Sequence, residues 1–378
     1  MPQSRMLEKA PGESPDWKDK VTSMPLLRVA QLGLIAGLAG LACLGLAPAA
    51  LARPKPPPVI EAPPPPPPMP DVSLARSLVA AAGAYDDYMH EAAMISPAAL
   101  TDPGAVGQSL RAGAAYEAAQ LRIGMVAYGA IAALTDNAFV ADVRRAGATP
   151  QERYALETKI FSNPKYALQF ADGPRAAGIA KAAMISGGLR LYDAGNAVRL
   201  AAYSIQQQPW SLQPPADLAT RADAIKRLSN SPRPSPGAET QRLDLMIAGE
   251  PPPGLAFDPA AGRRTDLVVR AVALAALASI GEATDQDAPR LGWLTDDYYL
   301  DHCLAEAKLA LFECLAVARP NYEDVFCLGQ HAMKDTGACV VIGSGGAVPI
   351  DIDVRPLAVP PARMHHHHAP VRHRRRRT

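Results

Sequence analysis

Two short clusters of histidine and carboxylate residues are the segments best equipped to do chemistry. In the first, Asp86 and His90 are four residues apart and Glu91 follows directly. The second, segment 296–302, holds three aspartates and ends at His302. Residues four apart share one face of a helix, so each cluster would present carboxylate and imidazole groups together. If both helices lined one cleft, these groups could bind a metal ion or perform acid–base catalysis. The candidate ligands are Asp86, His90, Glu91, Asp297 and His302.

The two clusters also have a simpler interpretation, in which they form ion pairs on the surface while the neighbouring tyrosines pack at helix edges. The sequence contains no H-E-x-x-H, no G-x-S-x-G and no P-loop motif. Gly343–Gly346 follow a short apolar run, but Pro349 argues against a helix after them, so we interpret this segment as a linker. We therefore favour the surface interpretation and a protein without catalytic residues.

The carboxyl-terminal tail holds most of the remaining candidates. A run of four histidines could bind a divalent metal ion weakly, and we expect no other cofactor. These residues are His365, His366, His367 and His368. A run of four arginines would attract anionic lipid or polysaccharide by charge alone, unless the tail is simply a solvated end. These residues are Arg374, Arg375, Arg376 and Arg377.

The charge balance separates this tail from the rest of the chain. The 378 residues carry 38 basic and 37 acidic side chains, a formal net charge of +1. The stretch 362–378 holds six arginines and no acid, so the net charge falls from +1 to −5 when it is set aside. This balance excludes a wholly basic nucleic-acid-binding protein and an acidic disordered one. We expect neither a nucleic acid nor a small-molecule substrate as partner.

The amino-terminal region predicts export. Arg28 precedes 24 residues without a charge, and these end at Ala50-Leu51-Ala52, the form that signal peptidase prefers. A start at Met24 makes residues 24–52 a signal peptide and residues 1–23 a leader or a misassigned start. The protein would then reside in the periplasm or elsewhere in the envelope or outside the cell. Two alternatives stay open: an uncleaved membrane anchor, because 24 residues can span a bilayer, and lipid attachment at Cys43.

Proline divides the remaining chain. Segment 53–70 contains six consecutive prolines, and as polyproline II it would form a spacer of roughly 55 Å. Segment 209–263 is also proline-rich, with short helices expected at 216–228 and 241–248. It would either separate two subdomains or cross over one core.

The rest of the chain reads as helices. Apolar residues are 48% and aromatic residues only 5%, so alanine, a strong helix former, supplies much of the apolar content. We expect a helical domain at 71–208 and a helical segment at 264–342, with the charge-free Ile123–Leu134 at the centre. Thr149 and Glu152 form a capping box around Pro150, which starts a helix ending near Ser162. Helices are expected over 72–95, 116–134, 149–162, 174–208, 265–283, 293–318 and 321–336, the fourth kinked at Gly187-Gly188.

Four cysteines lie in the last helical segment: Cys303, Cys314, Cys327 and Cys339. An even number in an exported chain predicts disulfides, and zinc is less favoured because no CxxC pair occurs. The first two lie on one predicted helix about 16 Å apart, too far for a disulfide. In an antiparallel hairpin, facing residue numbers have a constant sum. Nested pairing gives 641 and 642, whereas crossed pairing gives 630 and 653, so we predict Cys314–Cys327 and Cys303–Cys339.

The angles between successive cysteines around the helix axis support this register on the first helix of the hairpin only. Eleven residues from Cys303 to Cys314 complete about three turns, but the twelve from Cys327 to Cys339 overshoot by about 120°. We expect Gly337 to cap the second helix and to leave Cys339 just beyond it. The pattern resembles the twin-cysteine helical hairpins of coiled-coil–helix type, with wider cysteine spacing. The resemblance implies hairpin geometry and no function.

The sequence therefore predicts an all-α, irregular helical array that ends in a disulfide-stapled antiparallel hairpin, with a disordered proline-rich spacer before it and a basic tail after it. We expect an exported bacterial envelope protein of structural or interaction type. Its partners would be envelope proteins or an anionic lipid or polysaccharide surface. The alternative is a periplasmic metal-binding protein or metal-dependent enzyme that uses the clusters at 86–91 and 296–302.

Overall fold

The computed structural model describes residues 68–250 and 264–349, and every regular element in these ranges is helical. The predicted all-α class is therefore confirmed. The leader, the signal segment, most of the spacer and the His- and Arg-rich tail lie outside the described residues. The longer helices are α1 (Arg76–Ala93), α2 (Pro103–Ala114), α3 (Ala118–Leu134), α4 (Asn137–Ala146), α5 (Pro150–Ser162), α6 (Gly173–Ile205), α7 (Arg221–Ser229), α8 (Gly237–Ile247), α9 (Asp266–Ser279), α11 (Tyr298–Val317), α12 (Asn321–Cys327) and α13 (Thr336–Gly343). Shorter elements are η1 (Pro97–Ala99), η2 (Pro164–Gln169), η3 (Pro209–Leu212), α10 (Ala288–Leu291), η4 (Gly292–Thr295) and the π-helical η5 (Leu328–Asp335).

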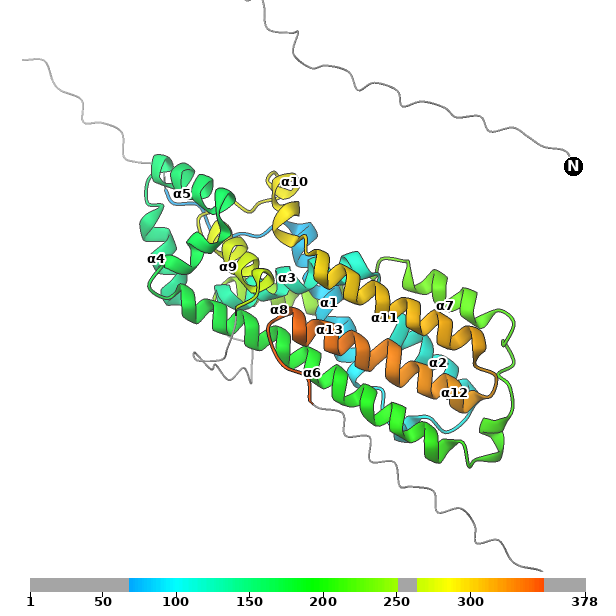
Figure 1. Cartoon of the computed structure of the whole chain (residues 1–378). Helices are drawn as coiled ribbons and strands as arrows, with labels where there is room; N and C mark the ends of the chain where they lie inside the picture. Colours follow the sequence, from blue (N-terminus) through cyan, green and yellow to red (C-terminus); the bar gives the residue numbers. More distant parts are fainter. Residues whose placement is uncertain (1–67, 251–263, 350–378) are drawn as a thin grey trace, which may run out of the picture. The chain divides into compact units, whose positions relative to one another are not determined.

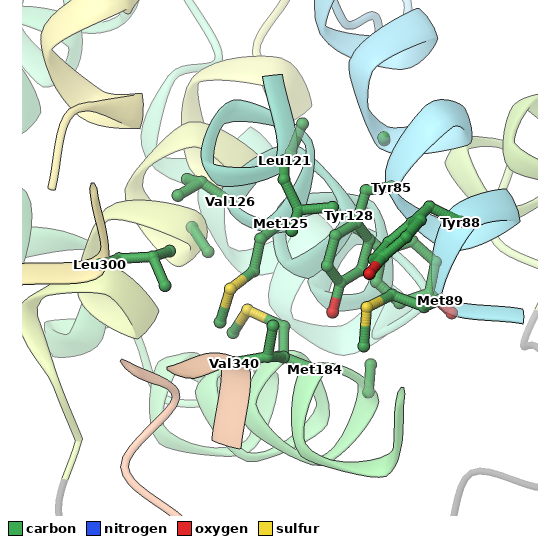
Figure 2. Packing of buried hydrophobic residues seen from close by; sticks show 14 of the residues in the cluster. Tyr85, Tyr88, Met89, Leu121, Met125, Val126, Tyr128, Met184, Leu300 and Val340 are labelled. Carbon is green, nitrogen blue, oxygen red and sulfur yellow. The ribbon is translucent and has the colours of Figure 1, made fainter. Parts of the chain in front are cut away.

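Helix α3 is the centre of the core, as its charge-free sequence predicts. It packs against α1, α6 and α9, and Ile131 has no exposed surface. Figure 2 shows Met125 and Tyr128 of this helix among side chains from other helices, including Tyr85 of α1 and Met184 of α6. Because side chains from α1, α3, α6, α11 and α13 meet here, the described helices share one continuous hydrophobic core.

No single helix in the described ranges has the length and hydropathy needed to cross a membrane. Helices α3 and α4 reach that threshold only together, and they meet at 89°. The apolar stretch Val268–Ile280 forms a buried helix, α9, as expected.

Local signals set several helix ends where the sequence predicts them. The Thr149 side chain accepts a hydrogen bond from the Glu152 amide at 3.3 Å, and the Glu152 carboxylate accepts one from the Thr149 amide at 2.9 Å. This capping box starts α5 at Pro150, and the helix ends at Ser162. The expected capping box is therefore confirmed.

The structure shows no break at Gly187-Gly188, where a kink or break was expected, because α6 continues through both glycines as one 33-residue helix. A Cβ atom on Gly188 would lie 2.8 Å from Val341 Cγ2 and 2.9 Å from Val340 Cγ1. Here glycine allows α13 to approach closely, and that packing offsets the cost of glycine within a helix.

The second helical segment of the hairpin, residues 321–343, also differs from the prediction. Gly337 does not cap a helix; α12, η5 and α13 follow one another without a break, and Cys339 lies within α13. A π-helix closes i→i+5 rather than i→i+4 bonds, so it turns only about 80° per residue. Eight such residues between Cys327 and Cys339 remove about 160°, so the 120° overshoot becomes a difference of only about 40° in the other direction. Both cysteines therefore face α11.

The predicted nested disulfides are present in the hairpin. Cys303 bonds Cys339 and Cys314 bonds Cys327, each with 5.7 Å between Cα atoms. Figure 1 shows α11 running beside α12 and α13, with α6 along the other side of the latter two. The hairpin is thus covalently locked at both ends and packed on the longest helix.

The described residues of the proline-rich segment 209–263 pack on the same core. Helix α7 contacts α2 and α11, and α8 contacts α1 and α3. Ile225 and Leu243 of these helices are almost fully buried. Helices α7 and α8 start at 221 and 237, whereas 216 and 241 were expected. This arrangement favours a crossing over one core.

Candidate functional site

The first carboxylate cluster is occupied by arginines from the proline-rich segment. Arg242 donates to Asp86 at 2.5 Å, and Arg233 donates through Nε to Asp87 at 2.8 Å. Arg233 also pairs with Glu91. These contacts join α1 to residues some 150 positions later, so the cluster fastens the segment to the core. The sequence interpretation as ion pairs fits this geometry, and His90 is exposed beside it.

The second cluster also has structural partners. Asp297 accepts a hydrogen bond from the Leu300 amide at 2.9 Å and so caps α11. Arg122, which is buried on α3, lies 2.6 Å from Asp301 and 3.4 Å from Asp296. His302 is exposed and stacks on Tyr298 with 6.1 Å between ring centroids.

No group of three or more His, Cys, Asp or Glu side chains that could hold a metal ion forms within residues 68–250 and 264–349. The structure therefore does not bring the candidate ligands Asp86, His90, Glu91, Asp297 and His302 together as such a group. The histidine run 365–368 and the arginine run 374–377 fall outside the described residues.

The hairpin instead concentrates exposed apolar side chains. Of the twelve large hydrophobic residues that are exposed in the described part of the chain, five lie on the hairpin between positions 298 and 342. They are Tyr298, Tyr299, Leu309, Val317 and Ile342. A spacing of seven residues places Leu304 and Leu311 on one side of α11, which is buried, and Leu309 and Val317 do not share that side and are exposed.

At the turn of the hairpin Val317 borders a groove of about 320 Å³, which we call the tip groove. It lies between the end of α6 and the Cys314–Cys327 disulfide. Its apolar and aromatic lining includes Tyr203, Val317, Tyr322 and Phe326, and Gln206 and Glu323 are also at its wall. Val317 is 74% exposed, so the groove is open to a partner.

The backbone of the tip groove is fixed by a buried ion pair. Arg221 lies 2.9 Å from Asp324, and both side chains are at most 4% exposed. The same guanidinium donates to the carbonyl oxygens of Leu315 at 3.1 Å and Ala318 at 2.8 Å, at the end of α11. Burial raises the pKa of Asp324 to about 6, against the attraction of Arg221. Sequence spacing gives no sign of this pair, because its members are about 100 residues apart.

Two buried carboxyl groups predict an unusual pH dependence of stability. Burial also raises the pKa of Asp86 to about 6, although Arg242 opposes the shift. A carboxyl group that holds its proton more tightly in the folded chain stabilises the fold fully below its unfolded pKa, and that contribution disappears as pH rises through about 6. We expect the free energy of unfolding to be about 1 kcal/mol higher per group at pH 5.5 than at pH 7.5.

Urea unfolding at the two pH values measures this difference. In Asp324→Asn the group no longer titrates, so about half of the gain should vanish. A wild-type free energy of unfolding that falls between pH 7.5 and 5.5 would contradict the assignment.

Comparisons of this chain with protein-family models, with curated proteins and with solved structures found no match.

Proposed function

We propose that this protein is an exported protein of the bacterial envelope that works by binding a partner and carries out no catalysis. The observation that carries the proposal is the concentration of exposed apolar side chains on a hairpin locked by two disulfides. Disulfides persist in oxidising compartments, which is compatible with export. The charge-free segment before Ala52 supports the same compartment.

The tip groove is the part of the hairpin best suited to a partner. A concave, mostly apolar surface with aromatic walls gains free energy when it covers an apolar segment of another protein, at about 25 cal/mol per Å² buried. The Cys314–Cys327 disulfide and the Arg221–Asp324 pair fix its shape, so little order has to be gained on binding. The partner that fits is an envelope protein with an exposed apolar segment.

The regions outside the described residues would support this role. Segment 53–70 would hold the helical body away from a surface, and Arg374–Arg377 would attract anionic lipid or polysaccharide. The histidines 365–368 could bind a divalent metal ion weakly.

Substitution of Val317 by aspartate is expected to weaken partner binding at least tenfold, because it places a charge in the apolar groove. The free energy of unfolding should change by less than about 0.5 kcal/mol, since Val317 is 74% exposed. The partner is first captured in cells by a photo-reactive residue at position 317, and its affinity is then measured with purified proteins.

Tyr154→Asp is the matched control, because Tyr154 is 71% exposed on α5 and does not line the groove. Equal weakening by both substitutions, or recovery of the protein in the cytoplasm with four free thiols, would overturn the proposal.

A further inference from the structure

A second exposed surface lies at the other end of α11, where acidic and aromatic side chains gather. We call it the acidic patch and define it by Asp296, Tyr298, Tyr299, His302 and Glu306. Tyr298 and Tyr299 are 74% and 83% exposed, and the carboxylate side chains of Asp296 and Glu306 are 72% and 64% exposed. This surface is chemically distinct from the apolar tip groove.

The negative charge of the acidic patch is only partly compensated by nearby cations. The ion pair of Asp296 is with Arg122 at 3.4 Å, and that guanidinium is 11% exposed and shared with Asp301. Glu306 lies 3.8 Å from His302 Nε2, which is charged only when protonated. On α11 itself the single lysine, Lys308, is buried and donates to the carbonyl oxygens of Tyr116 and Ser229. Both outward carboxylates can therefore accept hydrogen bonds from a cationic ligand.

The aromatic rings of the patch suit an arginine in particular. Tyr298 and Tyr299 lie edge to face with 5.8 Å between centroids, and the His302 ring is within 4° of parallel to Tyr298. A guanidinium can stack on such a ring while its N–H groups reach a carboxylate, whereas a lysine ammonium makes these contacts less well. The chain uses the same contact elsewhere, where Arg290 lies 5.3 Å from the Phe161 ring centroid.

The chain itself carries a matching ligand in its tail. Residues 362–378 hold six arginines and no acid, and Arg374–Arg377 are consecutive. The described chain ends at Pro349, whose carbonyl oxygen accepts a hydrogen bond from Tyr192 of α6 at 3.1 Å, so the tail has to reach the patch from the α6 side of the hairpin. The 24 residues between Pro349 and Arg374 can span at most about 80 Å, and tethering raises the effective concentration of a ligand to roughly the millimolar range.

We propose that Arg374–Arg377 bind the acidic patch of the same chain. The contact goes beyond the proposed binding function and does not depend on the tip groove. Its consequence is a competition: the arginines held on α11 are withheld from anionic lipid or polysaccharide, and a surface of sufficient charge density displaces them. Because the contact is between charges at the protein surface, it weakens as salt is added.

A photo-reactive residue at position 299 of the full chain tests the contact directly. The expected adduct joins position 299 to residues 369–378 of the same copy, and it disappears in 0.5 M salt and when all four arginines are replaced by glutamine. The same photo-reactive residue at Leu212, which is 56% exposed, is the control and should give no such adduct. Mixing isotopically light and heavy chains separates contacts within one copy from contacts between copies. Absence of the adduct, or an adduct only between copies, would overturn the proposal.

Binding of the full chain to vesicles that contain about one-third phosphatidylglycerol tests the competition. Removing two charges of the patch by D296N/E306Q should tighten binding at least threefold more than D193N/D223N does. The second pair removes the same charge from exposed positions on α6 and α7. Equal effects of the two pairs would mean that the tail is not held by the patch. Neither experiment involves Val317, so its outcome is separate from that of the tip groove.

Discussion

Removing the outer disulfide by C303S/C339S will lower the free energy of unfolding by about 4 kcal/mol, and removing the inner one by C314S/C327S by about 3 kcal/mol. The outer bridge spans 36 residues of sequence and the inner one 13. A cross-link restricts the unfolded chain more when its loop is longer, and this loop-closure entropy gives the two values. Each loss is a large share of the 5–15 kcal/mol typical of a folded domain. Urea unfolding without reductant measures both.

The pairing itself is checked by peptide mapping without reductant, which should recover Cys303 with Cys339 and Cys314 with Cys327. The control is the wild-type protein in dithiothreitol, which reduces both bridges. The reduced protein should be less stable than either double variant without reductant. The loop-closure explanation would be contradicted if the inner bridge contributed more than the outer one. It would also be contradicted if removal of both bridges lowered the free energy of unfolding by less than about 1 kcal/mol.

The disulfide pairing of the hairpin could be predicted from residue spacing alone. One distance, between Cys303 and Cys314, and one sum of residue numbers were enough to choose the nested pairing, which the structure confirms. The same reasoning placed Cys327 and Cys339 about 120° apart around the second helix and explained this difference by a cap at Gly337. The difference was real, but the π-helix η5 reduces it. That element packs on α6, and no local motif in the sequence was used to predict it.

The two carboxylate clusters show the opposite limit. Their helical spacing was visible, but their partners were not, because Arg233 and Arg242 lie 146 and 156 residues away from Asp87 and Asp86. An (i, i+4) pattern locates residues on one face of a helix and says nothing of what covers that face. On α11 the helical spacing separates buried from exposed residues only in part. Leu304 and Leu311 share one side and are buried, but Leu315 lies off that row and is only 2% exposed.

The predictions at Gly187-Gly188 and Gly337 considered only the low helix propensity of glycine and not its packing against another helix. Gly188 and Gly195 of α6 face Gly337 and Gly329 of the hairpin, and the facing residue numbers add to 525 and 524, the constant sum of an antiparallel pair. A Cβ on Gly195 would lie 2.8 Å from the Gly329 carbonyl oxygen, and one on Gly337 would lie 2.7 Å from that of Gly188. These four positions let two helix backbones touch, which explains why the helices remain unbroken at glycine.

Replacing Gly329 by alanine should therefore cost at least about 3 kcal/mol, the upper end of what overpacking in a core usually costs. The new methyl group would meet the Arg199 amide nitrogen at 2.3 Å and the Arg199 Cα at 2.7 Å. Both are backbone atoms, so no side chain can rotate away, and α6 and η5 must move apart together. Urea unfolding with the disulfides intact measures the loss.

Gly292→Ala is the matched control, because a Cβ at Gly292 meets nothing within 4 Å and the residue has helical backbone angles. Alanine there should leave stability unchanged or raise it by up to about 1 kcal/mol, since it restricts the unfolded chain without a clash. If Gly329→Ala proved as harmless as Gly292→Ala, the contact between the two backbones would be looser than described.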